Sequence, residues 1–199
     1  ARPVDFSPEA LISPCDGLLR VYPVREGVVV PVKDVPYSLD ALLRNRALAK
    51  AYEGGMCLVF RLTPSHYHRY VYPDEGYKSR NVFLPGVLHT VQPIATEAVP
   101  VYRENCREYT LLHTEHFGTI TFMEVGAMMV GRICNYQEEG HFRKGEEKGR
   151  FEFGGSTIVL LVQKDKVKLR SDWKESLMQE QEVPVHMGER IGRAINLVK

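Results

Sequence analysis

The sequence predicts a mainly β (α+β) fold: an antiparallel β-sandwich or barrel-like core with a few short helices. Apolar runs of strand length recur at intervals of about ten residues. Glycine and proline, 16 and 12 of the 199 residues, separate these runs. Only one segment has the apolar periodicity typical of a helix. A chain of this length can bury a full core, so we expect a single domain over residues 1–199.

The predicted strands are short apolar runs bounded by turn residues. They are Gly17–Val24, Val28–Val32, Cys57–Leu62, Arg80–Leu84, Val87–Val91, Glu108–Thr114, Gly118–Val125, Met128–Cys134 and Thr157–Val162. The polar stretch Gln137–Arg150 carries charges of both signs, and we expect an exposed loop there. After residue 162, a short helix is expected near Asp172–Met178 and a last strand near Pro184–Gly188.

The predicted helix spans Ser38–Ala51. Ser38 can cap its first turn, and leucines 39, 42, 43 and 48 form an apolar face with helical spacing. Gly54-Gly55 follows and ends the helical pattern.

The composition excludes several classes of protein. The chain has 26 Lys and Arg against 25 Asp and Glu, and this balance gives no electrostatic reason to expect nucleic-acid binding. The four cysteines have neither C-x-x-C nor metal-ligand spacing, so we expect reduced, mostly buried thiols and no metal site. No apolar run approaches the roughly 20 residues of a membrane-spanning helix. Since the chain starts at Ala1 rather than Met, an upstream segment is expected to be missing.

The most informative segment is Gly154-Gly155-Ser156-Thr157, which leads into the apolar run Ile158–Val162. Glycines before a buried strand mark a bulge, a turn or a close approach to the backbone. Because Gly155 has no Cβ, the Ser156 hydroxyl can reach the carbonyl carbon of Gly155. That attack would convert the peptide to an ester. Elimination would then cut the chain and leave Ser156 as a pyruvoyl group, a built-in electrophile. A plain bulge or turn is the alternative reading.

Self-cleavage also needs a base for the serine and a carboxylate to orient that base. Asp16 lies in the turn Ser13–Gly17 at the head of a predicted strand, although Asp-Gly is also ordinary turn chemistry. His66 and His68 follow a strand through Thr63-Pro64-Ser65. Histidine titrates near neutral pH and suits the role of base, although one of the two can be a structural histidine.

Other polar residues are weaker candidates. His89 alternates with apolar neighbours in a predicted strand. His113 and His116 could share a metal only on a helix, which the nearby Gly118 disfavours. Glu124 lies inside an apolar strand, where a buried carboxylate would need a partner, or it points to solvent.

Several motifs together resemble the phosphatidylserine decarboxylase family, and they occur in that family's order. They are Ser13–Gly17, Phe60–Pro64 with Tyr67–Arg69, Val125–Gly131, Phe153–Thr157 and Met187–Gly192. The resemblance covers essentially the whole chain and implies a self-cleaving proenzyme. The cut between Gly155 and Ser156 would give a β chain of residues 1–155 and an α chain of residues 156–199 carrying a covalent pyruvoyl cofactor. The implied triad uses Asp16, a histidine and Ser156.

The chain departs from the family at one position. Many members carry a second histidine where this chain has Val71, and they assign it to the triad. His68 matches the first histidine, which the family uses around decarboxylation. His68 could therefore serve both steps, or His89 could supply the base from a neighbouring strand; we favour His68.

The resemblance implies a carboxy-lyase that converts phosphatidylserine to phosphatidylethanolamine and CO2 through a Schiff base, with the pyruvoyl group as electron sink. The expected partners are the membrane surface and a second copy in a homodimer. The expected location is the cytoplasmic face of the cell membrane, as a peripheral protein. Two alternatives remain: a cytoplasmic decarboxylase of a free amino acid such as tryptophan, and a non-enzymatic relative.

Overall fold

The protein is built around one large antiparallel sheet. The computed structural model describes residues 3–89, 102–126, 132–152, 156–173, 175–176 and 181–195. The sheet order is β14 (Gly140–Phe142), β7 (Gly76–Lys78), β11 (Arg107–Thr114), β12 (Gly118–Val125), β16 (Ser156–Val162), β5 (Met56–Leu62), β2 (Gly17–Pro23) and β18 (Val183–Val185). β8 (Val82–Leu84) also pairs with β11. The mainly β, α+β prediction is confirmed, and the described strands form open sheets rather than a closed one.

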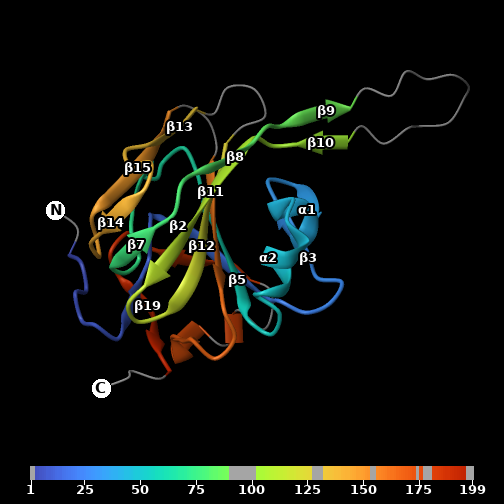
Figure 1. Cartoon of the computed structure of the whole chain (residues 1–199). Helices are drawn as coiled ribbons and strands as arrows, with labels where there is room; N and C mark the ends of the chain where they lie inside the picture. Colours follow the sequence, from blue (N-terminus) through green and yellow to red (C-terminus); the bar gives the residue numbers. More distant parts are fainter. Residues whose placement is uncertain are drawn as a thin grey trace, which may run out of the picture.

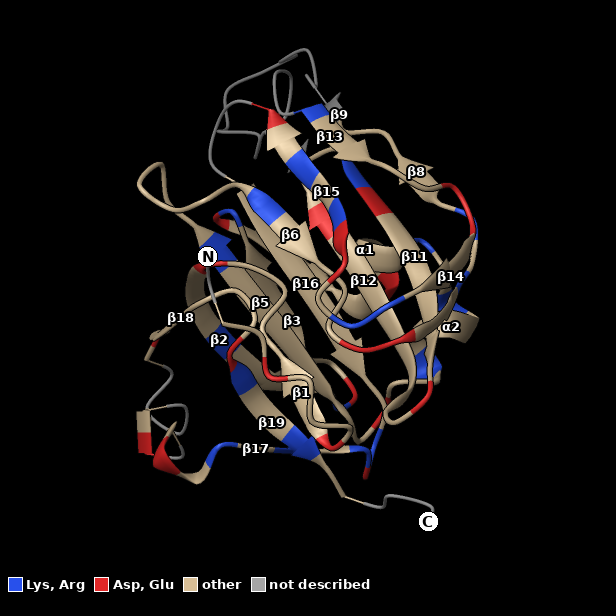
Figure 2. Cartoon of the chain, turned by 90° about the vertical axis from the view of Figure 1, so that its left-hand side faces the viewer, with Lys and Arg blue, Asp and Glu red and all other residues tan. Residues whose placement is uncertain are grey.

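A second layer covers one face of this central sheet. It consists of two three-stranded sheets: β1 (Ala10–Ile12), β19 (Arg190–Ala194) and β17 (Val167–Leu169), and then β13 (Arg132–Asn135), β15 (Glu147–Glu152) and β6 (Arg69–Val71). Figure 2 shows β6, β15 and β13 in front of the central strands, with charged residues along β15. The main core, a cluster of buried residues that includes Phe60, Tyr70, Phe122 and Phe151, lies between the two layers.

The other face is covered by a smaller unit. The hairpin of β3 (Val29–Val32) and β4 (Val35–Ser38) is followed by α1 (Leu39–Leu43) and α2 (Arg46–Lys50). These elements lie on the opposite side of the sheet from β13, β14 and β15 (Figure 1). A second core, which includes Leu42, Tyr52, Met123 and Val159, fills the space beneath them.

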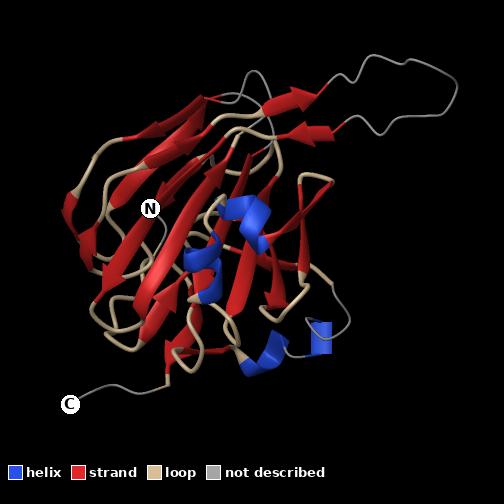
Figure 3. Ribbon diagram, turned by 45° about the vertical axis from the view of Figure 1, so that its right-hand side comes forward, coloured by secondary structure: helices blue, strands red, loops and turns tan. Residues whose placement is uncertain are grey.

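The predicted helix is in fact two short helices. Ser38 caps α1, as expected, by accepting a 3.2 Å hydrogen bond from the amide of Ala41. Arg44 then adopts a left-handed conformation with φ 47°, and Asn45 caps α2 by accepting 3.0 Å from the amide of Leu48. A second capping side chain inside the periodic segment therefore breaks the helix. Strands make up most of the regular structure, and the helices are short (Figure 3).

The predicted loop at Gln137–Arg150 was wrong. The segment contains β14 and most of β15, and Lys148 within it is only 1% exposed in its side chain. The prediction failed because mixed charge usually indicates solvent exposure, whereas here the lysine is neutralised inside the fold by a residue distant in sequence.

The remaining expectations concern the other strands, the motif residues, the cysteines and membrane-spanning helices. The strands at 17–24, 28–32, 57–62, 108–114, 118–125 and 157–162 are confirmed to within two residues, and the last predicted strand is β18 with β19 following it. The motif residues 127–131 and 153–155 lie outside the described part of the chain. The cysteines are free thiols, with Cys15 and Cys57 buried and Cys106 and Cys134 half-buried. Among the described residues, none of the helices has the length and apolar character needed to cross a membrane.

Candidate active site

Ser156 is the first residue of β16, the strand at the centre of the large sheet. All seven residues of β16 are buried, and Ser156 is 3% exposed. It pairs with Leu62 at the end of β5. Because side chains alternate along a strand, Ser156 shares a face with Ile158 and Leu160, which belong to the main core. The serine hydroxyl is therefore directed to the interior between the two layers. Gly155 itself is outside the described residues.

Asp16 lies in the turn before β2 and is 4% exposed. Its Oδ1 accepts a 2.9 Å hydrogen bond from the backbone amide of Met187. Ser13 is joined to the same C-terminal segment by two backbone hydrogen bonds, to Glu189 at 2.8 Å and from Gly188 at 2.9 Å. The first and last of the motif segments thus hold each other in place.

The register of the sheet brings Asp16 and Ser156 to the same end. Arg61 of β5 pairs with Leu18 on one side and with Thr157 on the other. The starts of β2 and β16 therefore lie on either side of β5, with backbones about 10 Å apart at the usual strand spacing. A Cβ on Gly17 would lie 3.0 Å from the carbonyl oxygen of Arg61, so the glycine after Asp16 allows β2 to approach β5 closely.

His68 follows the end of β5 and is half-buried. Its Nε2 lies 3.1 Å from the carbonyl oxygen of Thr63, which requires Nε2 to carry a proton and donate. The carbonyl of His68 accepts from the amide of Phe151 at 2.9 Å, and the amide of Val71 donates to Pro14 at 2.8 Å. These bonds place His68 between the Asp16 turn and the strand that leads toward residues 153–155.

The other predicted histidines differ in position. His66 has a local structural contact, since its Nδ1 accepts 2.9 Å from the amide of Thr63. His89 lies in β9 (Val87–His89), which pairs only with β10 (Tyr102–Glu104) in a separate two-stranded ribbon; its side chain is outside the described part. Its role therefore stays a prediction.

His116 lies in the turn between β11 and β12, at the end of β12 away from Ser156. Its Nδ1 is 3.0 Å from the buried carboxylate of Asp74. His116, Glu75 and Glu115 form a group whose ligand atoms lie within 4.8 Å of one another and could hold a cation, although the sequence analysis expected no metal site.

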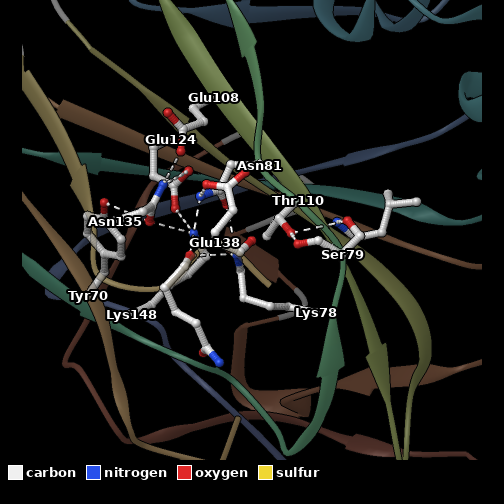
Figure 4. Close-up of polar contacts among 12 residues, drawn as sticks. Tyr70, Lys78, Ser79, Asn81, Glu108, Thr110, Glu124, Asn135, Glu138 and Lys148 are labelled. Carbon is white, nitrogen blue, oxygen red and sulfur yellow. Dashed lines mark hydrogen bonds and ion pairs between the residues drawn. The ribbon is translucent and has the colours of Figure 1, made fainter. Parts of the chain in front are cut away.

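Glu124 points into the main core, not to solvent. Its side chain is 0% exposed and forms an ion pair with Lys148 of β15 (Figure 4). Asn135 bridges the pair: its Oδ1 accepts from Lys148 at 2.6 Å, and its Nδ2 donates to Glu124 at 3.4 Å and to Glu108 at 2.7 Å. Burial raises the pKa of Glu124, and Lys148 opposes that shift. Nearby, burial lowers the pKa of Lys78 to about 8.

Sequence reasoning missed Lys148, Asn135, Glu108 and Lys78 as members of this cluster. The one available signal was Glu124, a carboxylate among apolar residues whose partner had to come from elsewhere in the chain.

The fold and the site together define a class: an antiparallel β-sheet protein with a buried serine at the head of its central strand, and a carboxylate and a histidine at the same end. The chain matches the phosphatidylserine decarboxylase family over residues 1–193. It is 44% identical over 198 residues to a phosphatidylserine decarboxylase proenzyme of Clostridium novyi, covering 96% of this chain and 66% of the relative.

Two further similar proteins are also phosphatidylserine decarboxylase proenzymes by name. Phosphatidylserine decarboxylase proenzyme 2 of Clostridium acetobutylicum is 43% identical over 182 residues, covering 92% of this chain and 62% of the relative. A proenzyme of Clostridium botulinum strain Hall is 42% identical over 195 residues, covering 96% and 66%. The chain belongs to the phosphatidylserine decarboxylase family, and it spans slightly less than two thirds of the length of these curated relatives.

Proposed function

We propose that this chain is the catalytic part of a self-cleaving proenzyme that converts phosphatidylserine to phosphatidylethanolamine and CO2. The family match supports the reaction class. The observation that carries the proposal is the position of Ser156: a buried hydroxyl directly after a glycine, at the head of the central strand and at the same sheet end as Asp16 and His68.

In the proposed cleavage, the Ser156 Oγ attacks the carbonyl carbon of Gly155 and displaces the Ser156 nitrogen, giving an ester. Elimination of the ester releases residues 1–155 with a C-terminal carboxylate. Addition of water to the resulting double bond, with loss of ammonia, leaves the pyruvoyl group on residues 156–199. We assign His68 as the base and Asp16 as the carboxylate that supports it.

Two observations favour His68 over another histidine. Val71, at the place of the family's second histidine, is 5% exposed and packs with Ala10 and Ile12 in an apolar cluster. The contact between Nε2 of His68 and Thr63 leaves Nδ1 as the nitrogen that can accept a proton. Because His68 is half-buried, it can take up a proton from solvent and donate it to the former α-carbon during decarboxylation.

The pyruvoyl group would supply the electron sink for decarboxylation, as other carbonyl cofactors do. It would need no separate binding residues, because it forms from Ser156 itself. Strand β16 pairs with β5 along all seven of its residues and with β12 along five, so the cleaved α chain would stay within the sheet of the β chain. We therefore expect the two chains to separate only on denaturation.

The test uses purified wild-type chain and two variants. Wild type should give two bands on denaturing electrophoresis, and its small chain should have the mass of residues 156–199 with a pyruvoyl end. Ser156→Ala should remain one chain. Thr157→Val is the matched control, because it removes the adjacent buried hydroxyl on the opposite face of the sheet, and it should be cleaved.

The substrate is tested separately with the cleaved protein. Release of CO2 from phosphatidylserine vesicles, with none from free amino acids such as tryptophan, is the expected result. The reverse pattern would replace the lipid assignment, and the peripheral location at the membrane, with a free amino acid in the cytoplasm. A wild-type chain that stays intact, with an ordinary serine at position 156, would overturn the proposal as a whole.

A further inference from the structure

The main core contains an ion pair that the proposed reaction does not use. Glu124 and Lys148 are 0% and 1% exposed in their side chains and pair directly. The aromatic rings of Phe122 and Tyr70 lie beside the ammonium, with ring centroids 4.9 and 5.7 Å from Nζ. The pair is therefore buried beside aromatic rings, with Asn135 as a polar neighbour that bonds both partners.

Such a pair is a poor way to stabilise a fold. Removing two charges from water costs several kcal/mol per ion, and well-packed apolar side chains of similar volume are often neutral or more stable. Phe122, Ile158 and Phe151 show that the surrounding core packs with apolar residues. The charges therefore point to a role other than stability.

The strand register places this pair beside Ser156. Glu124 of β12 is directly opposite Ile158 of β16. Ser156 is two residues before Ile158, so it is the diagonal neighbour of Glu124 on the same face, with Cα atoms about 7–8 Å apart. On the other side of Ser156, the β5 residues that share this face are Leu62 and Phe60, which are apolar.

Lys148 comes from the strand that precedes the proposed cleavage site in the sequence. It lies in β15, which ends at Glu152 and leads directly into residues 153–155. Glu124 and Lys148 therefore join the strand next to Ser156 with β15, the strand that precedes residues 153–155 in the sequence. Both residues lie upstream of the proposed cut, so the pair would persist in the β chain.

We propose that Glu124 and Lys148 are a positioning pair for self-cleavage: from the strand next to Ser156 they fix this serine for its attack, and the cleavage rate depends on the charge of Glu124. This inference rests on the proposed function. It adds two residues that take no part in the chemical steps and act by positioning the reacting residue.

Several groups lie around Glu124, and of these Lys148 and Glu108 act directly on its pKa. Lys148 comes from β15, Glu108 from β11, Lys78 from β7, Tyr70 from β6, and Tyr72 follows β6. Loss of Lys148 leaves an excess of negative charge, which favours the protonated form of Glu124.

The experiment follows maturation of the full chain during cell-free synthesis, sampled over time on denaturing gels between pH 5.5 and 8.5. Glu124→Leu combined with Lys148→Met removes both charges without leaving either one unpaired. We expect this double variant to fold, as judged by circular dichroism, and to cleave at least tenfold more slowly than wild type. Its cleavage rate should also change less with pH than the wild-type rate, because Glu124 is no longer there to titrate.

Single variants keep the test decisive if the double variant does not fold. Lys148→Arg keeps the charge and should retain the wild-type pH profile. Glu124→Gln keeps the shape and removes the charge, and it should change the profile. Lys144→Met is the matched control: Lys144 is also buried and pairs with a buried carboxylate, that of Asp74 at 3.4 Å, but this pair does not adjoin Ser156, and its loss should leave the profile unchanged.

The outcomes separate this inference from the proposed function. A folded double variant, or a folded Glu124→Gln, that cleaves at the wild-type rate with the wild-type pH profile would refute the positioning pair while cleavage itself stands. A wild-type chain that never cleaves would instead refute the proposed function.

Discussion

Replacement of Lys148 by methionine should destabilise the fold in a manner that depends on pH. The substitution keeps the volume of the side chain but leaves Glu124, at 0% exposure, without its cation. Breaking a buried pair in this way costs about 3–5 kcal/mol at neutral pH. Glu124 can reduce the cost by taking up a proton, since burial already raises its pKa above the ordinary 4.5.

The raised pKa of Glu124 determines whether the stability of the variant rises or falls with pH. A carboxyl group that binds its proton more tightly in the folded state favours folding below its unfolded pKa, and that contribution is lost as pH rises through the folded pKa. Each pH unit over which Glu124 is protonated only in the folded state changes the stability by about 1.4 kcal/mol. The stability deficit of Lys148→Met should therefore shrink between pH 7 and pH 5, by at most about 3 kcal/mol if Glu124 is protonated only in the folded state over both pH units.

The assay is urea unfolding monitored by circular dichroism at pH 5, 6 and 7. All samples carry Ser156→Ala, in which we expect no self-cleavage and therefore a single chain. The double variant Glu124→Leu with Lys148→Met should recover most of the lost stability and show no added pH dependence, because no buried charge remains. A deficit in Lys148→Met that is equal at pH 5 and pH 7 would refute the reasoning that an unpaired Glu124 is its cause.

Three other predictions concern the attachment of α1 and the candidate site. Arg107 is fully buried and donates from Nε to the carbonyl of Leu42 and from Nη2 to that of Ala41, each at 2.7 Å, so Arg107→Met should lower the free energy of unfolding by about 3 kcal/mol or more. Urea midpoints measure this, and a loss below about 1 kcal/mol would show that α1 does not depend on these bonds. Asp16→Asn should slow self-cleavage and His68→Ala should nearly stop it, as timed gels would show. Unchanged cleavage in Asp16→Asn would remove Asp16 from the triad, and normal processing in His68→Ala would direct attention to His89.

Much of the fold could be predicted from local patterns. The strand β16 was visible as a continuous apolar run because it is covered on both faces, by the main core and by the second core. The boundaries of β11 and β12 followed from alternation and from Gly118 at their turn. The helix was overestimated because a left-handed Arg44 cannot be anticipated from side-chain periodicity.

The candidate site could be predicted only in part. Ser156 could be singled out because it follows two glycines, whereas Asp16 and His68 were candidates as a carboxylate and a base, and the family resemblance selected them. Their common position at one end of the sheet depends on the pairing of β5 with both β2 and β16, which joins Arg61 to Leu18, 43 positions away, and to Thr157, 96 positions away. Lys148 was assigned to a loop because the sequence cannot show which distant carboxylate would neutralise it.

The sequence by itself determined the strand-rich architecture, the glycine–serine junction and the family resemblance, because these depend on residues adjacent in the chain. The tertiary structure decided which strands are neighbours, where the serine points and which charges are buried. Those properties arise from register and packing between distant segments. The Glu124–Lys148 pair is the clearest case: its two charges are tolerated in the core because β12 and β15 bring residues 24 positions apart into contact.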